Sequence, residues 1–221
     1  PPQQGGALRT YGLLHGLHQA GHEITLLSFH DGTTLPGDTP LAQFCGRIET
    51  VPPPLRSKTA RLRDLLLTGE PDIARRLYSD AFSDRLRTLL AEIPFDLVQF
   101  EGIEVACYLP LLRQWGTTAK LCYDAFNAEA ALQQVIFRVD RTNPKRWPAA
   151  VYSLIQARRI ARFEQQLCQQ ADSVIAVSDE DAAILSQLRP DHHVPVVTNG
   201  IFVDDYTRGG QQLDLGEHVI V

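Results

Sequence analysis

The chain opens with the stretch Pro1-Pro2-Gln3-Gln4-Gly5-Gly6-Ala7-Leu8-Arg9, in which a glycine pair runs directly into a helical pattern. Residues 24–29 follow as a strand, after a glycine at position 21 that suits a left-handed helix C-cap. No strand precedes the glycines, so we expect that the first strand of the sheet is missing from this sequence. The helix is expected to bury a stripe at steps of three and four: Ala7, Tyr11, Leu14, Leu17 and Ala20.

Further along the chain, short apolar runs alternate with helical patterns. The runs predict strands at 24–29, 48–51, 97–100, 120–123, 173–177 and 194–197. The patterns predict helices at 62–68, 73–92, 105–115, 129–139, 149–170 and 180–188, with a kink or boundary at Pro110. This alternation predicts an α/β fold, a doubly wound Rossmann-like parallel sheet with helices on both faces.

Composition narrows the class of protein without deciding it. The 221 residues are 44% hydrophobic and 21% charged, which is typical of a globular protein. The net charge of −5 argues against a dedicated nucleic-acid binder, which is normally basic. The four cysteines lie far apart, so we interpret them as reduced thiols of a cytoplasmic protein rather than metal ligands.

The glycine pair is itself a candidate binding site. Backbone amides of Gly5 and Gly6 at the start of a helix, together with the helix dipole, favour a phosphate or other anion. The alternative is a tight turn without a ligand, and the two glycines alone do not decide between them.

In a doubly wound sheet, ligands bind beyond the carboxyl ends of the strands. Glu101 directly follows an apolar strand and has a glycine beside it, which indicates either a cleft residue or an ordinary loop carboxylate. Asp124 and Asn127 follow the next strand, and Ser178 follows the one after it. These three residues have a structural alternative as helix N-caps, and Asp181 would complete a capping box with Ser178.

Several of these segments together resemble the N-terminal half of a retaining GT-B glycosyltransferase, of the large "group 1" family of bacterial polysaccharide and lipopolysaccharide sugar transferases. The resemblance covers nearly the whole chain. Its motifs are Gly5-Gly6 with Arg9, Gly21-His22-Glu23-Ile24-Thr25, Tyr123-Asp124-Ala125-Phe126-Asn127-Ala128-Glu129, Glu164 followed by Ala171-Asp172-Ser173-Val174-Ile175-Ala176-Val177-Ser178, and Thr198-Asn199-Gly200-Ile201.

The resemblance implies an acceptor-side domain at 1–198, a linker at 199–216 and the start of a donor-binding domain at 217–221. It also implies transfer from a nucleotide-diphosphate sugar to a saccharide or lipid-linked acceptor, with no metal or other cofactor. We expect Glu101 and Asn127 to contact acceptor or sugar hydroxyls as catalytic residues. Donor binding is then expected at Gly5, Gly6, Arg9, Ser178 and Asn199.

The sequence departs from the family pattern in one place, and the family's site extends beyond it. Phe126 stands where members usually have histidine, in a run similar to Asp-Ala-His-Asn-Val-Glu, and its ring cannot make the hydrogen bonds of an imidazole. The family's residues that grip the donor lie in the second domain, beyond Val221. We therefore expect this chain alone to be inactive, although the protein is expected to be an enzyme of the hexosyltransferase type.

A basic segment runs from Arg138 to Arg162. It holds seven basic residues against one acid, Asp140, which gives a net charge of +6, and Trp147 and Tyr152 lie within it. This mixture predicts binding to an anionic membrane surface or a lipid-linked phosphate, at the inner face of the membrane. The alternative is a solvated helix face.

Three classes of function remain open on the sequence. The first is the glycosyltransferase domain. The second is a sugar-nucleotide epimerase of the GT-B fold, which would be expected to carry more acid and base groups in this half. The third is a non-catalytic Rossmann-like module, an interpretation that Phe126 keeps open.

Overall fold

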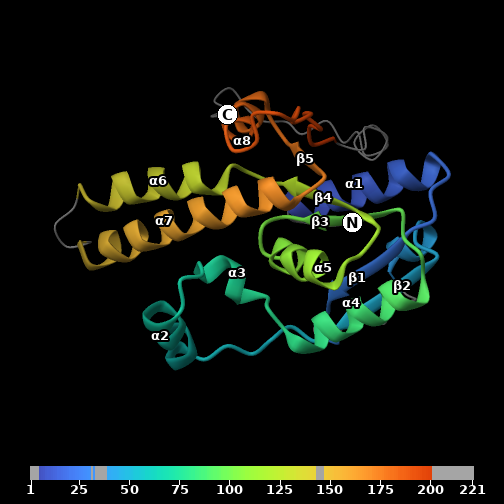
Figure 1. The fold of residues 1–221 in the computed structure, drawn as a ribbon, viewed down its shortest axis with the longest axis horizontal. Coiled ribbons are helices and arrows are strands. Elements are labelled where there is room, and N and C mark those ends of the chain that lie inside the picture. Colours follow the sequence, from blue (N-terminus) through green and yellow to red (C-terminus); the bar gives the residue numbers. More distant parts are fainter. Residues whose placement is uncertain (1–4, 31, 33–38, 143–146, 201–221) are drawn as a thin grey trace, which may run out of the picture.

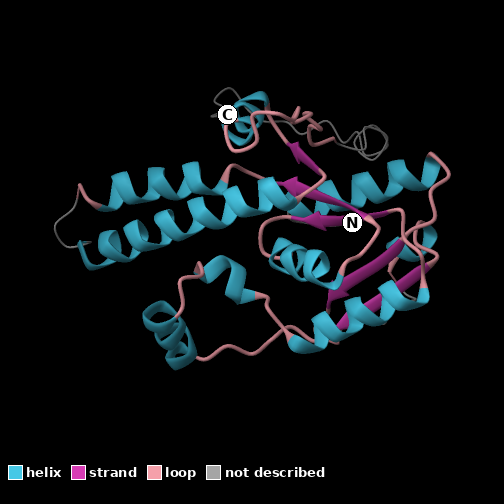
Figure 2. Cartoon of the chain, in the orientation of Figure 1, coloured by secondary structure: helices cyan, strands magenta, loops and turns pink. Residues whose placement is uncertain are grey.

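The structure is a computed structural model that describes residues 5–30, 32, 39–142 and 147–200. Its strands are all parallel and form two sheets, shown in Figures 1 and 2. β1 (Thr25–Phe29) pairs with β2 (Arg47–Val51). β3 (Leu97–Glu101), β4 (Lys120–Ala125) and β5 (Ser173–Ala176) form the second sheet in that order. The predicted α/β class with parallel strands flanked by helices is confirmed, although the strands form two sheets where a single sheet was expected.

The helices connect the strands as the alternation predicted. The long ones are α1 (Gly5–Gln19), α4 (Asp80–Glu92), α6 (Glu129–Asp140) and α7 (Trp147–Gln170). The shorter ones are η2 (Pro40–Gln43), α2 (Lys58–Leu67), α3 (Asp72–Arg76), η3 (Ala106–Tyr108), α5 (Leu109–Trp115) and α8 (Asp179–Ser186). The linker beyond residue 200 and the strand expected at 217–221 lie outside the described residues.

Two predicted elements differ from the structure, and a third divides where a boundary was expected. The helix expected at 73–92 is two helices, because Ser79 caps the start of α4 and the Tyr108 hydroxyl bonds the backbone of the intervening turn. The segment at 105–115 divides at Leu109, which confirms the predicted boundary at Pro110. The strand expected at 194–197 is reduced to one bridge, between Val196 and Ala176.

The α1 helix ends as predicted but buries a different set of residues. Gly21 has a φ of 85°, and the His22 amide donates to the Leu17 carbonyl, which closes the helix end. Of the predicted apolar stripe, Leu14 is buried, whereas the two alanines at its ends, at positions 7 and 20, are exposed. The other buried residue of α1 is Arg9, because this helix reaches the sheet through an ion pair.

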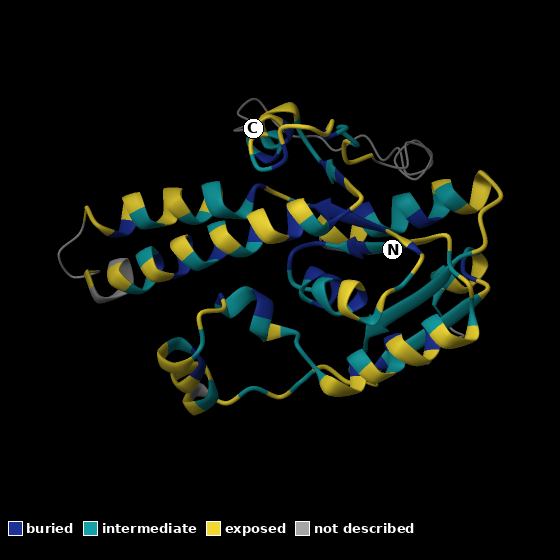
Figure 3. Cartoon of the chain, viewed as in Figure 1, coloured by how far each residue is buried: buried dark blue, intermediate teal, exposed yellow. Residues whose placement is uncertain are grey.

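The apolar core lies around the three-stranded sheet. Leu121, Tyr123 and Val174 are fully buried strand residues, and Leu112 and Leu167 cover them from α5 and α7. Figure 3 shows this buried centre and, by contrast, many exposed stretches along α6 and α7. No helix among the described residues combines the length and the apolar character needed to cross a bilayer.

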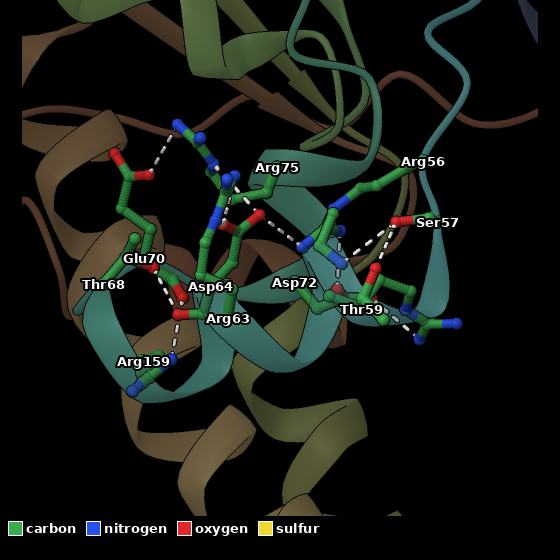
Figure 4. Close-up of polar contacts among 12 residues, drawn as sticks. Arg56, Ser57, Thr59, Arg63, Asp64, Thr68, Glu70, Asp72, Arg75 and Arg159 are labelled. Atoms are coloured by element: carbon green, nitrogen blue, oxygen red, sulfur yellow. Dashed lines mark hydrogen bonds and ion pairs between the residues drawn. The ribbon is translucent and has the colours of Figure 1, made fainter.

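The α2 helix is held mainly by charge. Arg56 donates to Asp64 at 3.0 Å and to Asp72 at 2.7 Å, and Arg159 of α7 donates to the Leu65 carbonyl at 2.8 Å. Figure 4 shows Arg56 extending toward Asp64 and Asp72, with Arg159 at a separate place along α2. Asp64 is the one buried residue among those of α2 whose burial is described, so α2 is fixed by polar contacts, whereas α3 also buries Ala74.

Candidate functional site

The site begins with two carboxylates at the carboxyl ends of adjacent strands. Glu101 ends β3 and pairs in register with Asp124 of β4. Register partners in a sheet point to the same face, and here α1 lies against that face. Thr10 of α1 donates to Glu101 Oε2 at 3.1 Å, and Arg9, its neighbour, bonds Asp124. Sequence reasoning found the two strand ends but missed Thr10.

Arg9 and Asp124 form a buried, two-pronged ion pair. Arg9 Nε donates to Asp124 Oδ2 at 2.9 Å, and Nη2 donates to Oδ1 at 2.7 Å. The remaining terminal nitrogen, Nη1, donates to the Val197 carbonyl at 2.5 Å and to Asn199 Oδ1 at 3.2 Å. One side chain therefore ties α1 to β4 and to the segment after β5. This geometry excludes the N-cap alternative for Asp124.

Glu101 is a partly buried acid in an unusual environment. Burial, together with the nearby charge of Asp124, raises the pKa of Glu101 to about 7. Hydrogen bonds from Gln99 Nε2 at 2.6 Å and from Thr10 oppose that shift. A carboxyl group with a pKa near neutrality at the edge of a sheet can both accept and donate a hydrogen bond at physiological pH.

Phe126 packs between the start of α1 and the turn after β3. A Cβ atom added at Gly6 would lie 3.2 Å from the Phe126 ring, and one added at Gly102 would lie equally close. Gly102 also has a φ of 87°, which disfavours any other residue there. Both glycines thus leave room for the aromatic ring. Through this ring the turn after β4 contacts the start of α1 and the turn after β3.

Two acids hold the turn between β4 and α6. Glu164 of α7 is fully buried, and its carboxylate accepts from the Glu129 amide at 2.7 Å and from the Ala130 amide at 3.2 Å. Asp181 of α8 accepts from the Ala128 amide at 2.8 Å. These contacts satisfy amides at the start of α6 that have no partner within the helix. Burial raises the pKa of Glu164 to about 7, against these two bonds.

Asn127 is exposed beside this turn, and its Nδ2 donates to Glu129 Oε1 at 3.1 Å. The N-cap position of α6 belongs to Ala128, so the capping alternative for Asn127 is wrong. Ser178 does cap α8: its Oγ accepts from the Asp181 amide at 3.1 Å and donates to Asp181 Oδ2 at 2.7 Å. Its predicted contact with a donor molecule stays a prediction.

A pocket of about 270 Å³ lies between α1 and the segment after β5. Arg9 and Asn199, two of the predicted binding residues, line it together with Leu8, Gly12, Leu13, Thr198 and Gly200. Gly5 and Gly6 begin α1 nearby in sequence, and the binding roles of all four residues stay predictions. Within the described part of the chain, no three His, Cys, Asp or Glu side chains are grouped so as to hold a metal ion.

The parallel sheets with helices on their faces, and polar residues gathered at the strand ends, define a Rossmann-like half domain of the GT-B type. Residues 4–200 match the family described as the Glycosyl transferase 4-like domain. The chain belongs to this family and is a glycosyltransferase domain of the N-terminal type. No curated protein matches the chain.

Proposed function

We propose that this domain forms the acceptor side of a retaining glycosyltransferase, of hexosyltransferase type, that moves a sugar from a nucleotide-diphosphate sugar to a saccharide or lipid-linked acceptor. The observation that carries the proposal is the arrangement of Glu101 at the end of β3, bonded to Thr10 and beside the Arg9–Asp124 pair. Family membership supports glycosyl transfer in general. The donor, the acceptor and retention are the parts proposed here.

Each site residue has a role in this proposal. Glu101 and Asn127 bind hydroxyls of the acceptor or of the transferred sugar. The amides of Gly5 and Gly6 bind the departing diphosphate, because preorganised dipoles stabilise charge that develops in the transition state. Arg9 acts through Asn199, whose amide oxygen it holds, and Ser178 lies on the turn after β5.

The rest of the active site belongs to a second, donor-binding domain in this proposal. The 221-residue chain alone is therefore expected neither to hydrolyse nor to transfer sugar from any nucleotide sugar. Sustained turnover by the purified chain, in proportion to its concentration, would contradict this. The four free cysteines support a cytoplasmic setting, where thiols stay reduced.

The replacement Glu101→Gln in the full-length protein tests the proposal. It keeps the side chain's shape and removes a carboxylate that would bind a hydroxyl, a hydrogen bond whose loss lowers turnover roughly 10- to 100-fold. Glu92→Gln is the matched control, because Glu92 ends α4 and pairs on the surface with Arg47, the first residue of β2, away from the carboxyl ends of the strands. Equal turnover in both variants would remove Glu101 from the mechanism.

One observation favours a second candidate, the non-catalytic binding module. The Phe126 ring packs against Gly6, where an anion would have to approach. A module of this kind would bind a nucleotide sugar or an acceptor without turnover in the full-length protein. The two proposals differ in turnover. In a binding module, Phe126→His changes the affinity for the nucleotide sugar or acceptor but creates no turnover.

A further inference from the structure

The exposed apolar side chains of the molecule gather on three helices. Ten of the thirteen large hydrophobic residues that are exposed in the described part of the chain belong to α2, α6 and α7. They are Leu62, Leu66 and Leu67 of α2, Leu132, Val135, Ile136 and Val139 of α6, and Trp147, Val151 and Ile155 of α7. Exposed apolar surface of this kind, where it is continuous, marks a place where something else binds, and the continuous stripe in question lies on α7.

On α7 the exposed apolar residues share one helix face with two arginines. Trp147, Val151 and Ile155 are followed at the same helical spacing by Arg158 and Arg162, in steps of four, four, three and four. Trp147 is 61% exposed and Val151 is 60% exposed. Both arginines are exposed as well. We call these five residues the outer face of α7.

The other faces of α7 pack against, or bond to, the rest of the fold. Ala157, Ile160 and Leu167 are buried, and α7 packs along α6 as a helical hairpin, which Figure 1 shows reaching beyond the sheets. Gln156 accepts from the Asp72 amide, and Arg159 donates to the carbonyl of Leu65 in α2 and to that of Glu70 beyond it. Arg159 is therefore a structural residue of the fold, although the sequence alone placed it with the other basic residues.

Within the described part of the chain, neither Arg158 nor Arg162 forms an ion pair with an acidic side chain. The one acid between 138 and 162 is Asp140, which is buried and accepts from Ser153 Oγ at 3.0 Å. Arg138 and Arg141 are exposed where α6 ends. A surface that combines apolar side chains, a tryptophan and unneutralised arginines is complementary to an anionic bilayer, whose interface is apolar below and negative above.

We propose that the outer face of α7 docks on an anionic phospholipid bilayer, with the helix lying in the plane of the interface. Trp147, Val151 and Ile155 enter the boundary between headgroups and acyl chains. Arg158 and Arg162 bind the lipid phosphates. This docking does not depend on glycosyl transfer, and its test requires no turnover.

The experiment uses the 221-residue chain and vesicles of phosphatidylcholine with or without phosphatidylglycerol. Sedimentation is expected with the anionic vesicles at low salt and to fall at high salt, because exposed charges are screened. Trp147 emission is expected to shift to the blue and to be quenched by brominated lipid. Trp115, the second tryptophan, is partly buried, and Trp115→Phe removes its contribution to the spectrum.

Two variants separate the contributions. Trp147→Ser/Val151→Ser/Ile155→Ser should lower vesicle affinity at least tenfold, because it removes the inserted apolar area. Arg158→Gln/Arg162→Gln should lower affinity roughly 30-fold at low salt, since each basic residue near such a surface contributes about fivefold. The matched control is Leu97→Ser/Lys120→Gln, an exposed apolar and basic pair that are register neighbours at the amino ends of β3 and β4.

The proposal holds if wild type and control bind alike and both α7 variants bind less, with melting temperatures unchanged. It fails if wild type does not sediment with anionic vesicles at low salt, or if the control loses as much affinity as the α7 variants. It also fails if the chain self-associates in solution and only the α7 variants make it monomeric. In that case a second copy, and not a bilayer, covers this face.

Discussion

In most proteins apolar side chains are buried and charged side chains are exposed. Two regions of this molecule depart from that rule: the strand ends of β3 and β4, and the outer face of α7. At the strand ends, charged side chains are buried and partnered, with Arg9 and Asp124 at 2% and 0% side-chain exposure. On α7, large apolar side chains are exposed. The first region is completed by the chain's own contacts. The outer face of α7 is not completed in this way within the described residues. Mutations on this face should therefore change stability and function separately.

The largest effect is expected from breaking the buried pair. Arg9→Ala leaves Asp124 charged, buried and without its two hydrogen bonds, which should cost about 3–5 kcal/mol of unfolding free energy. Denaturant unfolding of the chain measures it. Glu92→Ala, which removes an exposed ion pair with Arg47, should cost under about 1 kcal/mol. If both variants unfold at the same denaturant concentration, the account of this region is wrong.

Gly6→Val tests whether Gly6, in the same region, is needed for diphosphate binding or only for packing. A side chain there pushes against the Phe126 ring and stands over the amides proposed to bind diphosphate, so turnover of the full-length protein should fall roughly 100-fold. Gly6→Val/Phe126→Ala removes the clash with the ring. Turnover that stays low in this double variant assigns the loss to the amides. Turnover that recovers would make the glycine a packing requirement alone.

The pH dependence of stability distinguishes Glu101 from an exposed acid. Its pKa is raised in the folded state to about 7, so its favourable contribution is present below its unfolded pKa, near 4.5, and is lost as the pH rises through 7. Glu101→Gln should therefore be more stable than wild type at pH 8, by about 3 kcal/mol, with no advantage at pH 4. Unfolding curves at both pH values measure the difference. An equal effect at pH 4 and pH 8 would contradict the raised pKa.

The smallest effect is expected on the outer face of α7. Replacing Trp147, Val151 and Ile155 by serine should change the unfolding free energy by no more than about 0.5 kcal/mol each. Leu167→Ala on the buried side of the same helix should cost about 2–5 kcal/mol. Thermal unfolding of both variants compares the two sides. A large loss from the serine variant would show that the outer face is packed.

Much of the fold was predictable because its signals are local. The starts of β3 and β4, the left-handed Gly21 and the boundary at Pro110 each follow from neighbouring residues, although both strands run further than predicted and include Glu101 and Asp124. The break between α3 and α4 was not predictable, because the hydroxyl that supports it comes from Tyr108, far along the chain. At 194–197 the error has the other sign: the apolar pattern predicted a strand, and the structure has a single bridge at Val196.

The site was predicted only in outline for the same reason. Glu101 stood out because it follows an apolar strand and precedes a glycine. Its partner Thr10 and the Arg9–Asp124 pair join residues about a hundred positions apart, and no spacing rule reveals such contacts. Glu164 was noticed as part of a resemblance, but its grip on the start of α6 required the packing of α7. On α7 itself, the charges were visible and the direction in which each one points was not.

The central claim is that this domain serves retaining glycosyl transfer, and the most direct measurement is proton NMR of the full-length protein with a panel of nucleotide sugars and candidate acceptors. The account predicts that one nucleotide sugar is consumed, that nucleotide diphosphate is released, and that the new glycosidic bond keeps the anomeric configuration of the donor. An inverted bond would contradict retention. An intact nucleotide sugar with an epimerised ring carbon, or binding with no reaction across the panel, would contradict glycosyl transfer.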